Sequence, residues 1–177
     1  MKPLPTSRAT ARDAELARKL RARGVKNALR IILECRHRHD SVIPVSLGLA
    51  LQEQESKGQN IFGADTNAPF THQPVTKTRV LKLVEHVRAG GISNGVGPMQ
   101  LTFLPFIEEA NRDGGAWVPA VNIATGLGII AGHVKQHGVR KGLAVYNGGT
   151  PNSTKGLRYA EEVLERQERI HDEITPG

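Results

Sequence analysis

Apolar residues recur three or four positions apart over most of this chain, the spacing that places side chains on one face of an α-helix. The pattern predicts a mainly α-helical fold with little strand and no internal repeat. For the helix over residues 41–56 we expect Ser41 as the N-terminal cap and Pro44 in the first turn, where the missing N–H of proline costs nothing. The other predicted helices span residues 10–23, 25–38, 76–89, 102–112, 119–137 and 157–174.

The helix over 41–56 ends on a carboxylate, Glu55, which follows Leu47 and Leu51 at a spacing of four. It therefore shares a face with leucines, and Gly58 just behind it predicts that Glu55 lies in the last turn. Apolar neighbours and the negative end of the helix dipole both disfavour the charged form, so we expect a raised pKa for Glu55. A carboxylic acid that keeps its proton near neutral pH can act as a general acid. Most glutamates near a helix end are solvated, and Glu53 is interpreted as one of these.

Two segments lack helical periodicity. Residues 57–75 are rich in Gly, Pro, Asn and Thr and include Asp65, the first carboxylate after Glu55. Loops of this length in compact domains are usually functional. Residues 90–101 hold four glycines without the pattern of a phosphate-binding loop. We interpret these glycines as positions where the backbone approaches a ligand closely.

The helix predicted over residues 119–137 carries Gly126, Gly128 and Gly132. Glycine inside a helix costs stability unless a neighbour packs tightly against it. The three glycines therefore predict a central, crowded helix.

Composition is that of one globular domain, or one domain with an appendage. The chain has 177 residues, of which 38% are hydrophobic and 4% aromatic, so the core is expected to be aliphatic. No apolar run approaches the ~20 residues needed to cross a bilayer. The first residues are basic without an apolar stretch behind them, so no secretory signal is expected. Cys35 is the only cysteine, which excludes an internal disulfide.

Positive charge is concentrated at the front of the chain. Residues 1–40 hold 11 Lys and Arg against 4 Asp and Glu, which accounts for the whole net charge of +7. We expect a basic two-helix segment over 1–40, packed on a domain over 41–177. A polyanion such as nucleic acid, an anionic wall polymer or anionic lipid would meet this segment first. The alternative is an amphipathic helix pair whose outer face is rich in arginine.

Two groups of residues resemble metal ligands, but neither has the residue pattern of a known metal site. Cys35, His37 and His39 lack the spacing of a zinc site and a second cluster. His133 and His137 are four apart, but the residue after His133 is not the glutamate that a metalloprotease helix requires. We interpret both histidines as surface or helix-end residues and expect neither a metal nor a cofactor.

Four separated motifs together suggest a family. They are QES at 54–56, GPMQL at 97–101, NIATGL at 122–127, and VYNGG at 145–149 followed by YAEEVL at 159–164. In this order the chain resembles the soluble lytic transglycosylase and goose-type lysozyme superfamily over roughly residues 41–165. The resemblance implies a lysozyme-like helical fold and cleavage of the glycan strands of bacterial peptidoglycan. Without a signal peptide and with its basic front, the chain looks like a phage endolysin, held in the host cytoplasm until released to the wall.

The resemblance also implies roles for individual residues. Glu55 matches the catalytic acid, which protonates the glycosidic oxygen between N-acetylmuramic acid and N-acetylglucosamine. Tyr146 and Asn147 match the pair that orients this acid and contacts the sugar N-acetyl group, while Asn122 looks structural, a residue that ties a helix start in place. The residues implied to line the cleft or bind substrate are Gly97, Met99, Gln100, Tyr146, Asn147 and Tyr159.

Two reaction routes remain open. In lytic transglycosylases one glutamate donates the proton and then takes one back from the sugar's 6-hydroxyl, which closes a 1,6-anhydro ring; with Glu55 as the one clear acid, this route is favoured. A hydrolytic muramidase would use Asp65 as a second carboxylate, ~6.5–9.5 Å away for an inverting reaction. A module that binds wall polymer or nucleic acid without turnover is the alternative from another class of function. In either case we expect a monomer.

Overall fold

The computed structural model of the protein describes residues 9–39 and 42–174. Within these residues the chain forms eight α-helices and one π-helix, with isolated β-bridges in place of strands. The predicted mainly α-helical class is therefore confirmed. None of the described helices is long and apolar enough to span a bilayer. The elements are α1 (Ala11–Ala22), α2 (Ala28–Glu34), η1 (Cys35–His39), α3 (Val45–Glu55), α4 (Lys77–Arg88), α5 (Leu104–Arg112), α6 (Pro119–His137), α7 (Val139–Gly148) and α8 (Thr154–Ile174).

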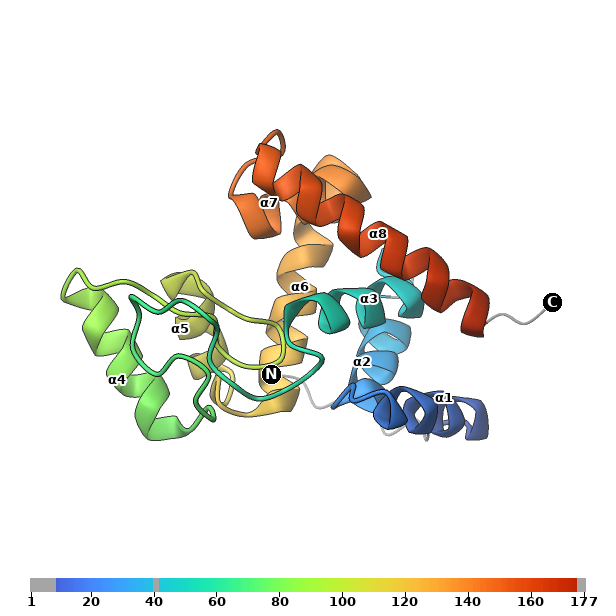
Figure 1. Ribbon diagram of the computed structural model, residues 1–177, viewed down its shortest axis with the longest axis horizontal. Coiled ribbons are helices and arrows are strands. Elements are labelled where there is room, and N and C mark those ends of the chain that lie inside the picture. The colour runs from blue at the N-terminus through green and yellow to red at the C-terminus, as the bar shows by residue number, and fades with distance from the viewer. Residues whose placement is uncertain (1–8, 40–41, 175–177) are drawn as a thin grey trace.

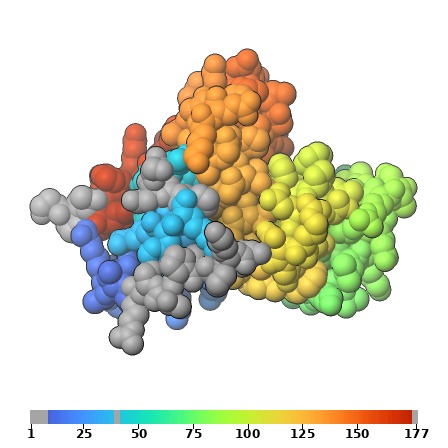
Figure 2. Space-filling view, turned by 180° about the vertical axis from the view of Figure 1, so that it is seen from behind, coloured from blue at the N-terminus to red at the C-terminus, as the bar shows by residue number. Residues whose placement is uncertain are grey.

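Helix α6 is the central element. In Figure 1 it runs between two groups of helices, with α4 and α5 on one side and α1, α2, α3 and α8 on the other. The view from behind in Figure 2 shows α6 (yellow to orange) between α2 (light blue) and α5 (yellow), and both helices contact it. Ile123, Leu127 and Ile130 on α6 are fully buried, because this helix supplies core residues to both sides.

The three glycines of α6 have different surroundings. A Cβ at Gly126 would lie 2.6 Å from Cβ of Met99, so the predicted close packing is correct at this position. Gly128 and Gly132 have open space around them, so the same prediction is wrong there. They lie on the exposed side of a helix that is crowded only along its inner face.

Helix α3 is buried almost all round, from Ser46 to Gln52, and packs between α2 and α8. Its contact with the front of the chain is close, because a Cβ at Gly48 would lie 2.3 Å from Sγ of Cys35. Pro44 precedes the helix as its N-terminal cap residue and does not enter the first turn as expected. Ser41, the expected cap, lies outside the described residues.

The basic front of the chain packs on the rest of the protein. Thr10 and Asp13 form a reciprocal capping box that starts α1, and Leu20 on the same helix is fully buried. Six of the seven arginines in residues 9–39 have partners within the fold, which balances much of their charge. These partners are the Ile174 carbonyl for Arg12, Glu15 for Arg18, Glu173 for Arg23, Glu34 for Arg30 and Arg38, and Asp13 for Arg36.

The segments on either side of α4 are loops, as predicted, and they are tied to each other. Isolated antiparallel bridges join Ile61 to Pro74 and Phe62 to Val96. Phe62 is fully buried and packs on Phe70, with ring centroids 5.4 Å apart. The two glycine-rich loops therefore form one connected wall beside α6.

Candidate active site

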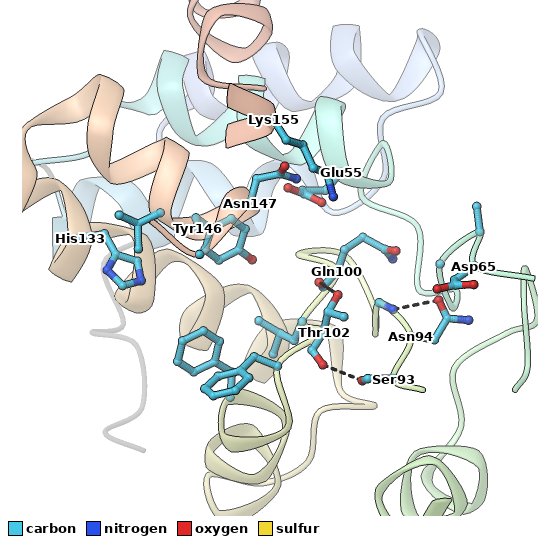
Figure 3. A pocket seen from close by; sticks show the side chains of 18 residues that line it. Glu55, Asp65, Ser93, Asn94, Gln100, Thr102, His133, Tyr146, Asn147 and Lys155 are labelled. Carbon is cyan, nitrogen blue, oxygen red and sulfur yellow. Dashed lines mark hydrogen bonds between the residues drawn. The ribbon is translucent and has the colours of Figure 1, made fainter. Parts of the chain in front are cut away.

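Glu55 lies in the last turn of α3, where the helix meets a cavity of about 820 Å³. The side chain is partly buried. Next to it, Ser56 ends the helix and its hydroxyl donates to the carbonyl of Pro98 at 2.8 Å. This bond holds the end of α3 against the second loop. Figure 3 shows Glu55 on the cavity wall beside Tyr146, Asn147 and Lys155.

Two tyrosine hydroxyls from the C-terminal helices organise this wall. Tyr159 on α8 donates a hydrogen bond to Oε1 of Glu55. Tyr146 on α7 donates to the backbone carbonyl of Met99 at 2.6 Å. Burial, followed by the nearby negative charge of Glu55, raises the pKa of both tyrosines well above the ordinary value. Both hydroxyls therefore keep their protons and remain donors at neutral pH.

The pKa of Glu55 is raised from 4.5 to about 7, mainly because burial penalises the charged carboxylate. The Tyr159 hydrogen bond and the positive charge of Lys155 act in the opposite direction. The prediction of a raised pKa is confirmed. Glu55 thus holds its proton for about half the time near neutral pH, as a general acid requires.

A buried asparagine fixes the turn that carries Met99 and Gln100. Asn122 is 0% exposed, and its side chain accepts from the Met99 N–H at 2.8 Å and donates to the Val96 carbonyl at 2.8 Å. A Cβ at Gly97 would lie 2.7 Å from the Asn122 amide, so this position requires glycine. The structural role expected for Asn122 is confirmed.

The residues of that turn do not all reach the cavity. Gln100 lines it, and its side-chain amide donates to the Gly97 carbonyl at 2.8 Å. Met99 is 0% exposed and packs beneath the wall against Gly126. The expectation that the Met99 side chain lines the cleft is therefore wrong, because the side chain packs into the core against Gly126 while its carbonyl accepts from Tyr146. Gly97 is likewise buried below the surface.

Asn147 presents an unsatisfied acceptor. It lines the cavity, and its Oδ1 atom is buried with no hydrogen-bond partner among the described residues. A buried acceptor without a partner costs about 1–3 kcal/mol. A substrate N–H donated to this oxygen would remove that cost.

Asp65 lines the same cavity from the first loop. Its side chain is exposed, and Oδ1 accepts from the backbone N–H of Asn67 at 2.9 Å. Figure 3 shows Asp65 and Asn94 on the wall across from Glu55, with Gln100 between the two carboxylates. Among the described residues, Glu55 and Asp65 are the only carboxylates that line this cavity.

The cavity includes several residues that sequence reasoning did not select. His133 was expected at the surface or a helix end, yet it lines the cavity, and burial followed by the charge of His137 lowers its pKa. Phe103 is 61% exposed and meets Phe106 edge to face, with ring centroids 5.2 Å apart. The exposed Lys155 lines the cavity as well. Apolar spacing gives no signal for such residues, because they share a cavity only after the helices pack.

The suggested metal groups can be placed only in part. Cys35 is fully buried in the core, and the side chain of His39 lies outside the described residues. Within residues 9–39 and 42–174 no group of three or more His, Cys, Asp or Glu could hold a metal ion.

Comparisons with known proteins found no match to this chain. No protein-family model matches the chain, and neither the curated proteins nor the solved structures contain a match.

Proposed function

We propose that this protein cleaves the β-1,4 bond between N-acetylmuramic acid and N-acetylglucosamine in peptidoglycan, with Glu55 as the general acid. The observation that carries the proposal is the environment of Glu55, a carboxyl with a pKa of about 7 on the wall of a cavity of about 820 Å³. A pKa near the working pH balances a high protonated fraction against ready release of the proton. The ordered motifs around it, which resemble the lytic transglycosylase superfamily, supply the substrate class.

The favoured route uses Glu55 alone. The protonated carboxyl gives its proton to the glycosidic oxygen, the bond to carbon 1 breaks, and positive charge develops on the sugar ring. The carboxylate so formed then accepts the proton of the sugar's own 6-hydroxyl, whose oxygen attacks carbon 1 and closes a 1,6-anhydro ring. Tyr159 supports the intermediate stage, because its hydroxyl donates to the ionised carboxylate.

Asn147 suits the recognition of an N-acetyl sugar. The acetamide group of such a sugar has one N–H donor, and Asn147 Oδ1 is a buried acceptor that lacks one. The carbonyl oxygen of the same acetamide group can stabilise the positive charge that develops on carbon 1 of the sugar. Asn147 therefore fits a substrate-orienting role beside the acid.

Asp65 keeps hydrolysis as the alternative reaction. It lines the same cavity as Glu55, on the wall across from the acid. In that route Asp65 activates a water molecule, and the product has a reducing end in place of an anhydro ring.

The test combines a variant with product analysis. Glu55→Gln keeps the shape of the side chain and removes the acidic proton, so peptidoglycan cleavage should fall by at least about 10²-fold with the fold intact by circular dichroism. Glu53→Gln is the matched control, since Glu53 lies on the same helix and pairs with Arg169 at 3.3 Å, outside the cavity. Mass spectrometry of the released fragments separates anhydro from reducing ends. Undiminished cleavage by Glu55→Gln would refute the assignment.

The basic front motivates a rival function, a module that binds an anionic wall polymer, lipid or nucleic acid without turnover. Binding that weakens steeply with salt, together with no release of fragments from purified peptidoglycan, would support this rival. A role in host lysis, as in phage endolysins, rests on the resemblance and follows only if the wall is cleaved.

A further inference from the structure

Lys155 is a cation at the reaction centre with no assigned task. It belongs to the first turn of α8 and lines the same cavity as Glu55. Figure 3 shows its ammonium end next to the Glu55 carboxyl, with Asn147 beside it. Its positive charge is one of the influences that lower the pKa of Glu55.

The Lys155 ammonium is available to a ligand. In the described part of the chain no ion pair or hydrogen bond engages it, although Glu55 is near enough to feel its charge. The other groups that face Glu55 are the neutral hydroxyls of Tyr159 and Tyr146. Elsewhere on the wall are His133, whose pKa is lowered by burial, and the carboxylate of Asp65.

The helix itself does not favour a lysine at this position. The first turn of a helix carries partial positive charge, so a cation there is unfavourable. The backbone is nevertheless held in place, because a Cβ at the neighbouring Gly156 would lie 2.3 Å from the carbonyl of Ala144 on α7. This close approach of α8 to α7 fixes the backbone position of Lys155. From there the side chain extends into the cavity.

We propose that Lys155 is a specificity-determining residue that binds a carboxylate carried by the muramic acid unit next to the cleaved bond. This inference rests on the proposed function and names the charged group that the site selects. Two sources share this chemistry: the lactyl carboxylate of a strand without peptides, and a carboxylate of the attached peptide. Neutral chitin-type sugars carry neither group.

Binding at Lys155 also has a consequence for the acid. A bound carboxylate neutralises the ammonium, which removes an influence that favours ionised Glu55. Glu55 then keeps its proton more firmly when a charged substrate is present than when the cavity is empty. Binding of a charged substrate would thus increase the protonated fraction of Glu55, the acid that cleaves it.

The kinetic test compares charge-matched substrates. Peptide-free glycan strands with free lactyl carboxylates, the same strands amidated to neutrality, and intact peptidoglycan are assayed with the wild-type protein, Lys155→Met and Lys155→Arg. The wild type should favour the charged strands by about tenfold in kcat/KM, as expected for one charge-assisted contact. Lys155→Met should lose this preference and Lys155→Arg should keep it. A fall in kcat/KM with Lys155→Met on the charged peptide-free strands assigns the lactyl carboxylate, and a fall confined to intact peptidoglycan assigns the peptide.

Lys141→Met is the matched control, because Lys141 is exposed on α7 and does not line the cavity. It should behave as the wild type. Lys155→Met with an undiminished preference for charged strands would overturn the proposal.

A second measurement does not depend on turnover. Free N-acetylmuramic acid, which has no glycosidic bond to cleave, is titrated into the wild-type protein and Lys155→Met while NMR follows the Glu55 carboxyl. The sugar acid should raise the pKa of Glu55 in the wild type and leave it unchanged in Lys155→Met. If the sugar acid raises the pKa of Glu55 but no glycan is cleaved, the proposed enzyme is refuted and the carboxylate site is retained. If glycan is cleaved without a preference for charged strands, the carboxylate site is refuted and the enzyme is retained.

Discussion

Tyr159 and Glu55 are 104 positions apart in the sequence, yet the tyrosine hydroxyl donates a hydrogen bond to Oε1 of the glutamate. The bond joins α8 to the end of α3, two helices that pack along each other. It stabilises the ionised carboxylate, while burial favours the protonated form. The balance of these opposing effects brings the pKa of Glu55 to about 7.

Removing that hydrogen bond should shift the pH dependence of cleavage. Tyr159→Phe eliminates an influence that lowers the pKa of Glu55, so this pKa should rise above its value of about 7. Because the acid must be protonated to act, the alkaline limb of the kcat/KM profile should move to higher pH. In Tyr146→Phe the limb should stay in place, since that hydroxyl bonds to the Met99 carbonyl. Identical limbs in Tyr159→Phe and the wild type would contradict the assignment.

Folding stability should also record the ionisation of Glu55. Its pKa is raised from 4.5 to about 7 in the folded protein, so the folded state holds a proton that the unfolded chain releases between these values. Stability should therefore fall as pH rises through this window. Glu55→Gln should exceed the wild type in stability by about 3 kcal/mol at pH ~8 and match it at pH ~4. Denaturant unfolding at the two pH values measures the difference in free energy of unfolding between the variant and the wild type. An equal difference at both pH values would exclude a raised pKa.

Asp65 should be dispensable if Glu55 works alone. Asp65→Asn keeps the side-chain size and the Asn67 turn, so cleavage should stay within about threefold of the wild type and the fragments should keep anhydro ends. Asp172→Asn, exposed on α8, serves as the reference substitution. Loss of about 10²-fold or more with Asp65→Asn, together with reducing ends in the wild-type products, would establish hydrolysis with two carboxylates.

Asn122 should be among the most sensitive positions for stability. Asn122→Ala leaves the buried Met99 N–H without a partner and removes one of the two bonds to the Val96 carbonyl, which still accepts from the Leu101 N–H, at a cost of about 1–3 kcal/mol. Asn152→Ala, in an exposed turn, should change stability by less than about 0.5 kcal/mol. Chemical denaturation of both variants gives the comparison. A small effect at Asn122 would mean that this turn does not depend on its side chain.

The glycines of α6 offer a matched pair of substitutions with opposite signs. Gly126→Ala would force a methyl group to within 2.6 Å of Met99 and should destabilise the protein by about 1–3 kcal/mol. Gly128→Ala adds a methyl group in open space and should stabilise it by about 0.5–1 kcal/mol through helix propensity. Thermal unfolding measures the melting temperature of both variants. Equal shifts in melting temperature would contradict the difference in packing between the two sides of α6.

Helical periodicity predicted most of the secondary structure with shifted ends. The predicted helices over 119–137 and 76–89 match α6 and α4 closely, because their apolar positions follow one continuous face. The helix expected over 25–38 begins later, at Ala28, after Asn27 adopts a left-handed backbone, and ends as the π-helix η1. Caps and distortions of this kind depend on contacts outside the segment, so periodicity does not show them.

The sequence by itself determined the helical class and the position of Glu55 at the end of α3, because these depend on spacing within one segment. Only the tertiary structure decided that Tyr159 bonds to Glu55, that Met99 lies beneath the cavity, and that Lys155 reaches into it. The physical reason is that the pKa of an acid and the reach of a cation depend on burial and neighbours, which come from segments far apart in the chain.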